Sequence, residues 1–212
     1  MYKHFVKRLF DIVLSTIGSI ILAVPMLIIA IMVKIDSHGP VFFRQRRVGL
    51  HKKEFTLLKF RSMPVSAPKN VATHQLDVSA IQMSKFQKTI RKLSIDELPQ
   101  LYNIWLGQIS ICGPRPALYN QYDLVAERDK YGANDVKPGL TGWAQINGRD
   151  ELEIEVKAKL DGDYTAALNA GNFKGFVMDC RCFFGTIISV VKSDGVVEGG
   201  TGAMEKHEEI KK

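Results

Sequence analysis

The chain has 212 residues, of which 46% are hydrophobic, and a net charge of +7. This length allows one domain with a sizeable core, and the excess of positive charge favours anionic partners such as nucleic acid, acidic lipid head groups or phosphorylated substrates. The three cysteines are odd in number and lack framework spacing, which argues against a secreted disulfide scaffold, and no cluster of His and Cys completes a metal site.

The most informative feature is an apolar stretch from Ile12 to Val33 that contains no charged residue. As a straight helix it is roughly 33 Å long, about the thickness of a bilayer core. It is too long for the apolar part of a signal peptide, and no small-residue cleavage site is recognisable. Apolar runs of this length are rare in the core helices of soluble domains, so residues 1–36 predict a membrane helix.

The course of this helix follows from its flanks and from Pro25. Both flanks are basic, and the positive-inside rule then favours the cytoplasm for both. Pro25 removes a helical hydrogen bond near the middle of the run and bends the helix. We therefore expect a re-entrant segment, with hydroxyl groups upstream as possible partners for the freed backbone. These hydroxyl groups belong to Ser15, Thr16 and Ser19, and the flanking cations include Lys3, Lys7, Arg8, Lys34, Arg44 and Arg46.

Residues 37–197 predict a mostly helical α+β domain. A turn signal at 37–40 is followed by two extended stretches, 41–48 and 55–60, that predict a short β-hairpin. The polar residues 64–80 predict a loop. Helical patterns follow at 81–92, 97–106, 117–131, 151–169 and 173–193.

The last helical pattern, 173–193, has a broad apolar stripe with two interpretations. It is typical of a core helix and equally of an amphipathic helix lying in the membrane interface, because both need such a stripe. Beyond it, residues 198–212 are rich in Gly and charge and predict a loose C-terminal tail.

An acidic pair, Asp96 and Glu97, precedes Pro99 in the segment SIDELPQL. Ser94 and Glu97 match a capping box, but Pro99 costs least in a first turn, which favours Asp96 as the N-cap. Helix capping is therefore the simplest interpretation. A helix start with two acids is also a suitable place for phosphate and metal chemistry.

Several fixed cations accompany this pair. In Gly113–Pro116 two prolines flank Arg115, which would hold its guanidinium in one direction and suits bidentate phosphate binding. The alternative is a rigid turn with a solvated arginine. Lys59 and Arg61 in KFRSM, and Arg149 at the end of GWAQINGR, are further candidates, although none is specific alone.

Together these motifs resemble the bacterial sugar transferases, and among them the small monotopic polyprenyl-phosphate phosphoglycosyl transferases. The similar segments are KRLFD (7–11), PVFFRQRRVG (40–49), KFRSM (59–63), SIDELPQLYNIWLGQISICGPRP (94–116), PGLTGWAQINGR (138–149), and Asp161 with Tyr164 in an L-D-x-x-Y pattern. Two positions depart from the family pattern: Val24 precedes Pro25 where the family usually has Ser, and Cys112 replaces a frequent Val.

The resemblance implies a two-step reaction at the cytoplasmic face of the bacterial inner membrane. Asp96 would attack a UDP-sugar and release UMP, and a polyprenyl phosphate such as undecaprenyl phosphate would take the sugar phosphate from Asp96. Glu97 would be the second catalytic acid, and Mg²⁺ would bind Asp96 or Glu97. Substrate-binding residues would be Lys59, Arg61, Arg115, Arg149 and Asp161, and the partners would include the bilayer and downstream glycosyltransferases.

A competing hypothesis is a membrane-anchored scaffold protein of a glycan assembly complex, whose basic face binds anionic lipids while the acids only cap a helix. Nucleic-acid binding is disfavoured by the membrane segment and the absence of a binding motif. The sugar and the glycan pathway, whether capsule, exopolysaccharide, O-antigen or glycoprotein, are left open by these residues.

Overall fold

The computed structural model describes residues 1–68, 81–148 and 152–192. Arg149 and the tail predicted at 198–212 therefore lie outside the described residues, as does most of the loop predicted at 64–80. The described part is mostly helical with two small sheets, which confirms the predicted fold class.

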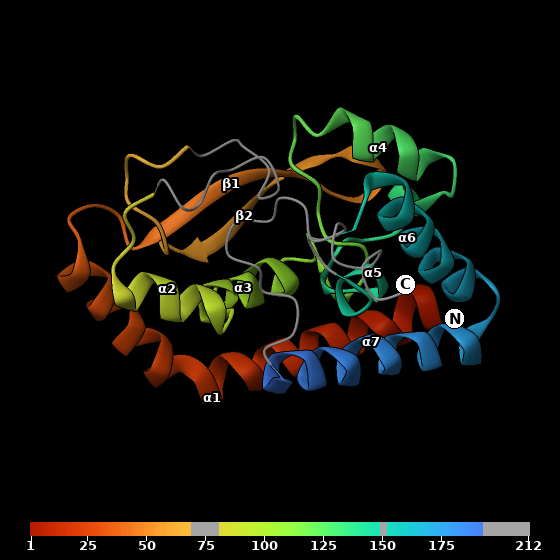
Figure 1. Cartoon of the computed structure of the whole chain (residues 1–212). Coiled ribbons are helices and arrows are strands. Elements are labelled where there is room, and N and C mark those ends of the chain that lie inside the picture. Colours follow the sequence, from red (N-terminus) through yellow and green to blue (C-terminus); the bar gives the residue numbers. More distant parts are fainter. Residues whose placement is uncertain (69–80, 149–151, 193–212) are drawn as a thin grey trace, which may run out of the picture.

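The chain opens with one continuous helical stretch. A π-helical turn, Tyr2–Val6, leads directly into α1, Lys7–Asp36. This stretch is long and apolar enough to cross a membrane, and only 6% of its most apolar window is buried. A core helix would be mostly buried, so the exposed apolar surface supports the predicted membrane helix. Pro25 lies inside α1, which is visibly bent in Figure 1.

The serine hydroxyls of α1 do not have the role expected for them. Ser15 donates to the carbonyl of Ile12 and Ser19 to that of Ser15. Both acceptors lie upstream of the carbonyl of Ile21, the one that Pro25 deprives of its partner. The hydroxyls therefore bond within their own turns and do not compensate for the proline.

The first charged residues of α1 attach it to the rest of the protein. Lys7 Nζ lies 2.7 Å from Asp179 Oδ2. Arg8 donates to the last carbonyls of helix α3, Gln100–Trp105, and Asp11 accepts hydrogen bonds of 2.9 Å from the Ser110 hydroxyl and the Ile111 N–H. The KRLFD motif thus anchors the membrane helix to the domain above it.

The predicted hairpin is present. Strands β1, Phe42–Val48, and β2, Glu54–Phe60, pair antiparallel from Phe42 opposite Phe60 to Val48 opposite Glu54. The turn η2, Leu50–Lys52, connects the two strands. Lys52 at the end of this turn forms a salt bridge with Asp129.

A second sheet was not predicted. Strands β3, Ser110–Cys112, and β4, Gly139–Thr141, are parallel and contain only three residues each. A Cβ added to Gly113 would overlap the backbone of Lys137 and Gly139, and one added to Gly142 would overlap Gly113. The glycines of the two Gly/Pro-rich motifs therefore permit this close approach of two backbones.

The helical regions are shorter than predicted around the acidic pair. Helix α2 covers Lys85–Lys92, the 3-10 turn η4 covers Ile95–Glu97, and α3 covers Gln100–Trp105 with Pro99 at its N-cap position. No side-chain capping hydrogen bond is present at the start of η4 or of α3. The prediction that Asp96 caps a helix is therefore wrong, because its side chain binds Ser62 instead.

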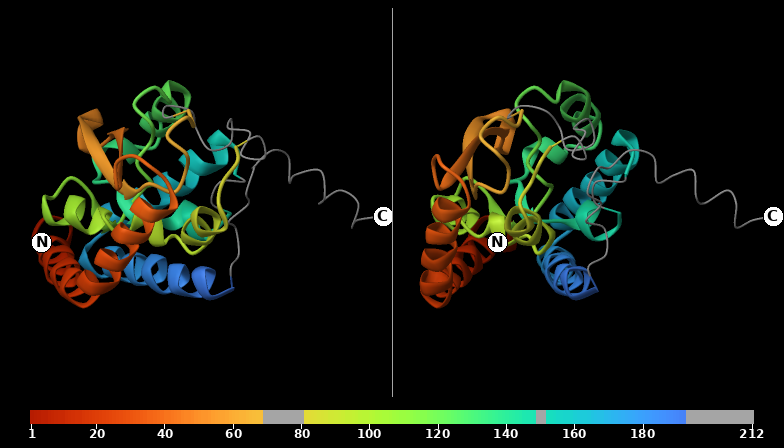
Figure 2. Two further views of the ribbon diagram at one scale, coloured as in Figure 1. Left: turned by 90° about the vertical axis from the view of Figure 1, so that its left-hand side faces the viewer. Right: turned by 60° about the vertical axis from the view of Figure 1, so that its left-hand side comes forward.

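The C-terminal helices complete the domain. They are α4, Tyr122–Asp129, the 3-10 turn η5, Ala133–Asp135, then α5, Trp143–Ile146, α6, Ile154–Asn169, and α7, Asn172–Lys192. Figures 1 and 2 show α1 and α7 along the lower side of the molecule, with the hairpin above them, and α7 packs against the N-terminal turn η1, Tyr2–Val6. Helix α7 buries Asp179 and Cys182 but exposes Phe173 and Phe184, so it has a core face and an exposed apolar face.

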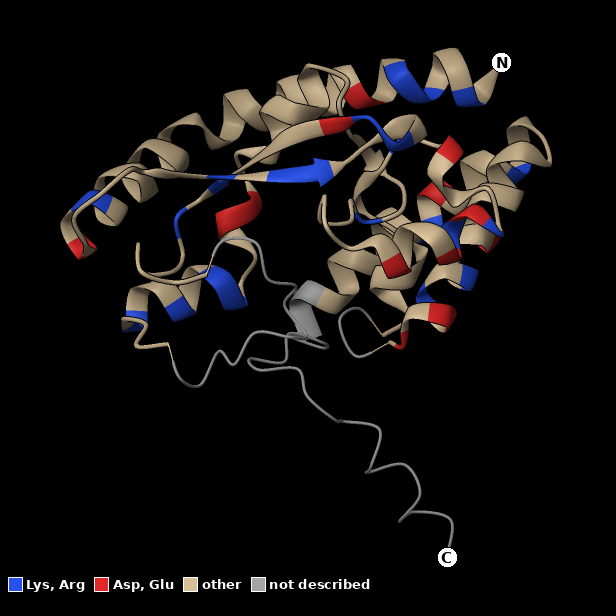
Figure 3. Cartoon of the chain, turned by 90° about the horizontal axis from the view of Figure 1, so that it is seen from above, with Lys and Arg blue, Asp and Glu red and all other residues tan. Residues whose placement is uncertain are grey.

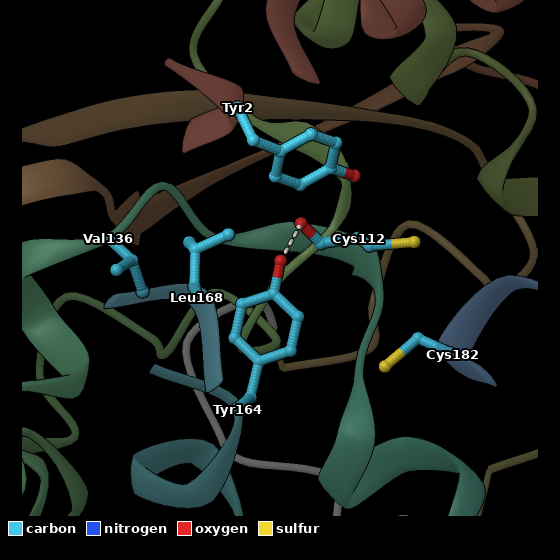
Figure 4. Packing of buried hydrophobic residues seen from close by; sticks show 6 residues of the cluster. All are labelled: Tyr2, Cys112, Val136, Tyr164, Leu168 and Cys182. Atoms are coloured by element: carbon cyan, nitrogen blue, oxygen red, sulfur yellow. Dashed lines mark hydrogen bonds between the residues drawn. The ribbon is translucent and has the colours of Figure 1, made fainter. Parts of the chain in front are cut away.

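One core cluster joins the N-terminus to this C-terminal part. Tyr2 packs with side chains of β3, α6 and α7, and Figure 4 shows Tyr164 at the centre with its hydroxyl on the carbonyl of Cys112. The same hydroxyl lies 2.7 Å from Asp179. Tyr164 of the L-D-x-x-Y pattern thus fixes the end of β3, from which Arg115 follows.

Candidate active site

The acidic pair lies in η4, which packs against both β2 and α2. Figure 3 shows an acidic turn beside basic segments of the hairpin and of α2. Ser94, just before the turn, has a left-handed backbone with φ of 55°. For a residue other than Gly this conformation costs roughly 1–2 kcal/mol, and such strain is concentrated at functional sites.

Glu97 is held by two cations. Its Oε1 atom lies 2.7 Å from Lys59 Nζ and 2.8 Å from Arg115 Nη2. Burial alone would raise the pKa of Glu97, but Arg115 and Lys59 together outweigh it and hold this pKa well below its usual range. Glu97 is therefore a carboxylate neutralised by two fixed positive charges.

Asp96 has a different environment. It is 5% exposed, and its Oδ2 accepts a hydrogen bond of 2.9 Å from the hydroxyl of Ser62. Burial raises the pKa of Asp96, against the opposing charge of Lys59 and with the help of neighbouring Glu97. Adjacent acids whose pKa values are pushed apart are typical of active sites in which two carboxyl groups have different roles.

The segment Lys59–Ser62 connects this pair to the membrane helix. Lys59 binds Glu97 and Ser62 binds Asp96, while Phe60 between them packs against Val33 of α1. Arg61 is buried and donates to the carbonyls of Val33, Ser37 and His38 at the end of α1. Arg61 was predicted to bind phosphate, but its hydrogen bonds connect the C-terminal end of α1 to the segment that contacts the acidic pair.

The segment that carries Arg115 is held through successive main-chain carbonyls. The carbonyl of Pro114 accepts from the Gly139 N–H at 2.9 Å, and that of Pro116 from Arg47 Nη1 at 2.8 Å. The carbonyl of Arg115 itself accepts from Arg128 Nη2 at 2.9 Å. The predicted rigid Gly-Pro-Arg-Pro turn is present, and its arginine points to Glu97 rather than to solvent.

Asp161, predicted to bind substrate, lies away from the acidic pair in the core of α6. It is 1% exposed, and its Oδ2 binds Arg128, with 2.8 Å to Nε. Burial raises the pKa of Asp161, although the charge of Arg128 opposes this shift. The structure therefore brings Asp96, Glu97, Lys59 and Arg115 together, and it connects Asp161 to them only through Arg128.

The acidic pair fits a cation that takes most of its ligands from a substrate. Among the described residues, one oxygen of each acid, Oδ1 of Asp96 and Oε2 of Glu97, has no hydrogen-bond partner. No group of three or more His, Cys, Asp or Glu that could hold a metal ion occurs in the described ranges. Mg²⁺ commonly binds through one or two carboxylates plus substrate phosphates, so two acids are sufficient.

A long exposed apolar helix, an acidic pair of divergent pKa and a surrounding set of fixed cations define a membrane-associated enzyme that handles anionic substrates. The chain matches the bacterial sugar transferase family over residues 2–193. It therefore belongs to that family, as the motifs indicated.

Curated relatives are of two lengths. The chain is 39% identical over 190 residues to a Bacillus subtilis (strain 168) protein named uncharacterized sugar transferase EpsL, covering 90% of this chain and 89% of that protein. It is 41% identical over 170 residues to the UDP-glucose:undecaprenyl-phosphate glucose-1-phosphate transferase of Escherichia coli (strain K12), covering 76% of this chain but 36% of the relative. An Aeromonas hydrophila UDP-N-acetylgalactosamine-undecaprenyl-phosphate N-acetylgalactosaminephosphotransferase is 35% identical over 164 residues, covering 76% and 38%. The chain thus spans little more than a third of the length of each of these last two relatives.

Two residues that complete the site were not singled out from the sequence. Ser62 lies inside the KFRSM motif, where nothing local distinguishes its hydroxyl from that of a solvated serine. Arg128 lies in a helical pattern with other charged residues, and nothing local distinguishes it from a solvated arginine. Only its 4% exposure marks it, because a buried arginine needs partners.

Proposed function

We propose that this chain transfers a sugar-1-phosphate from a UDP-sugar to a polyprenyl phosphate such as undecaprenyl phosphate, and releases UMP. Two of the relatives named above are, by their names, transferases of glucose 1-phosphate or N-acetylgalactosamine phosphate to undecaprenyl phosphate. The product would begin the assembly of a glycan on its lipid carrier. The sugar itself is not specified by these names, since two different sugars occur among relatives of similar identity.

The observation that carries the mechanism is the contrast between the two acids. Glu97 forms ion pairs with Lys59 and Arg115, whereas the hydrogen bond that Asp96 accepts within the described residues comes from a neutral donor, Ser62. A carboxylate that is less stabilised is the better nucleophile, so Asp96 is the acid suited to attack phosphorus. Glu97 is suited to orient the two cations beside it.

The reaction would proceed in two displacements. In the first, an Asp96 carboxylate oxygen bonds to the sugar-bearing phosphorus, and the bond from that phosphorus to the bridging oxygen breaks, so UMP leaves. In the second, a phosphate oxygen of the polyprenyl phosphate bonds to the same phosphorus and the Asp96–phosphorus bond breaks. Lys59 and Arg115 would stabilise the negative charge of the diphosphate. Bound Mg²⁺, held by Asp96 or Glu97, would supply further charge neutralisation.

The location follows the same argument. The exposed apolar surface of α1 would lie in the inner membrane, with the bend at Pro25 returning both basic flanks to the cytoplasm. The catalytic domain would then meet UDP-sugar from the cytoplasm and the lipid phosphate at the membrane surface. Downstream glycosyltransferases that accept the lipid-linked sugar would be its functional partners.

The test is UMP release by full-length protein in membranes, supplied with undecaprenyl phosphate, Mg²⁺ and a panel of UDP-sugars. We expect UMP from at least one donor with the wild-type chain and almost none with Asp96→Asn. The scaffold alternative predicts no UMP from any donor and lipid binding that Asp96→Asn leaves unchanged. Full activity of Asp96→Asn would remove Asp96 from the nucleophile role.

A further inference from the structure

A chain of hydrogen bonds runs from the core of α6 to the acidic pair. Asp161 Oδ2 accepts from Arg128 Nε at 2.8 Å, and Arg128 Nη2 donates to the carbonyl of Arg115 at 2.9 Å. The guanidinium of Arg115 in turn donates to Glu97 at 2.8 Å. Asp161 and Arg128 are 1% and 4% exposed, so neither reaches the surface where a substrate arrives.

The carbonyl of Arg115 is the main-chain group through which Arg128 acts on that residue. Pro114 and Pro116 have fixed φ angles, and their carbonyls accept from Gly139 and Arg47, so the residues on either side of Arg115 are already held. The orientation of the Arg115 carbonyl sets the ψ angle of that residue, and with it the direction of the side chain relative to the loop. The Arg128 donor on this carbonyl therefore restrains the backbone from which the Arg115 side chain reaches Glu97.

Arginine is suited to this task and lysine is not. The planar guanidinium presents donors in several fixed directions, so Arg128 can bind Asp161 and the carbonyl of Arg115 at once. A buried ion pair is weak evidence for stability, because its desolvation cost offsets much of its attraction. Its more specific contribution here is a fixed orientation of the Arg128 donors.

We propose that Arg128 and Asp161 are positioning residues that act through Arg115, holding its carbonyl so that its guanidinium stays on Glu97 beside Asp96. Asp161 then has a role behind the site, in place of the substrate contact expected from the sequence. This inference rests on the proposed function, because the position of Arg115 matters only if phosphate transfer occurs at Asp96.

The first test compares kcat and KM for UMP release by Arg128→Lys and Asp161→Asn in the full-length protein, with Lys130→Ala as the matched control. Lys130 is an exposed residue next to the same helix and pairs with Glu127. We expect both core variants to lower kcat by about 10- to 100-fold, as misplaced catalytic groups do, with KM changed by less than about 3-fold. The control should retain wild-type values.

The second test is a mutant cycle that a merely structural role would not satisfy. If Arg128 acts through Arg115, then Arg128→Lys should cost less than about 2-fold in an Arg115→Lys background. The inference would be overturned if the loss of activity in the double variant equalled the product of the losses in the two single variants. It would also be overturned if Arg128→Lys alone were as active as an active wild-type chain. If neither Arg128→Lys nor Asp161→Asn shows a cooperative thermal unfolding transition, both variants are unfolded. The pair is then structural and the inference is wrong. A wild-type chain that releases no UMP from any donor would instead remove the proposed function, and the inference with it.

Discussion

The hydroxyl of Ser62 lies 2.9 Å from Oδ2 of Asp96 and is the hydrogen-bond partner of that carboxylate in the described residues. The same short segment binds Glu97 through Lys59 and the end of α1 through Arg61. The orientation of Asp96 is therefore coupled to the point where the membrane helix ends.

Ser62→Ala should lower kcat for UMP release by about 10-fold, because the carboxylate of Asp96 loses the donor that fixes its rotamer. Ser66→Ala is the matched control, since Ser66 is an exposed residue in the same region. The kinetics of both purified variants decide the matter. Equal activity of the two variants would show that Ser62 does not orient the nucleophile.

The two acids should differ in their effect on stability. Glu97→Gln leaves Lys59 and Arg115 without their shared counter-ion and should destabilise the fold by about 3 kcal/mol. Burial raises the pKa of the Asp96 carboxyl, which means that its charged form is costly inside the protein. Asp96→Asn removes this charge and should therefore leave the unfolding temperature unchanged or higher. Thermal unfolding of both variants in the same detergent measures the difference. An equal loss of stability would contradict the assigned environments.

Gly113→Ala should prevent folding or sharply reduce the yield of folded protein, because its Cβ would overlap the backbone of Lys137 and Gly139 across the β3–β4 pair. Gly18→Ala in α1 is the control, since a Cβ there meets Leu101 at an ordinary 3.6 Å. Expression and size-exclusion profiles of the two variants provide the comparison. Normal folding of Gly113→Ala would mean that the parallel pair tolerates separation.

The cysteines should react unequally with iodoacetamide at pH 8. Burial raises the pKa of Cys182 to about 12 and that of Cys112 well above its usual range, so little of the reactive thiolate forms at either. Cys180 is only half-buried. Peptide mapping should find alkylation at Cys180 before the other two, and rapid modification of Cys112 or Cys182 in the folded protein would contradict their burial.

The re-entrant course of α1 can be tested by labelling. Single cysteines introduced as Lys3→Cys and Lys34→Cys, in a chain with Cys180→Ser, should both react with an impermeant maleimide from the cytoplasmic side of oriented vesicles. The reason is the bend at Pro25 between two basic flanks. Labelling of the two positions from opposite sides would establish a spanning helix instead.

The membrane helix and the hairpin could be predicted from short stretches of sequence, because each forms from residues that are close together in the chain. The apolar run predicted α1, and the two extended stretches at 41–48 and 55–60 predicted the hairpin. The parallel pairing of β3 with β4 could not be predicted, because its three-residue strands lie far apart in the chain and depend on glycine contacts that only the fold reveals. The capping role given to Asp96 failed for a similar reason, since Ser62 competes for its side chain from a distant segment.

The candidate site shows the same division. Motif resemblance indicated Asp96, Glu97, Lys59 and Arg115, and the structure brings these four together. It gives Arg61 and Asp161 partners that no local pattern specifies, namely the end of α1 and the buried Arg128. Such partners depend on tertiary packing, which a single sequence does not display.

The central claim is that Asp96 becomes covalently bonded to a sugar phosphate. The most direct measurement is the mass of the intact chain after incubation with the productive UDP-sugar and Mg²⁺ in the absence of polyprenyl phosphate, followed by peptide mapping. We predict an added mass of one sugar phosphate on the peptide that contains Asp96, lost on addition of undecaprenyl phosphate and absent in Asp96→Asn. An active chain that forms no adduct, or that carries the adduct on Glu97, would contradict the account.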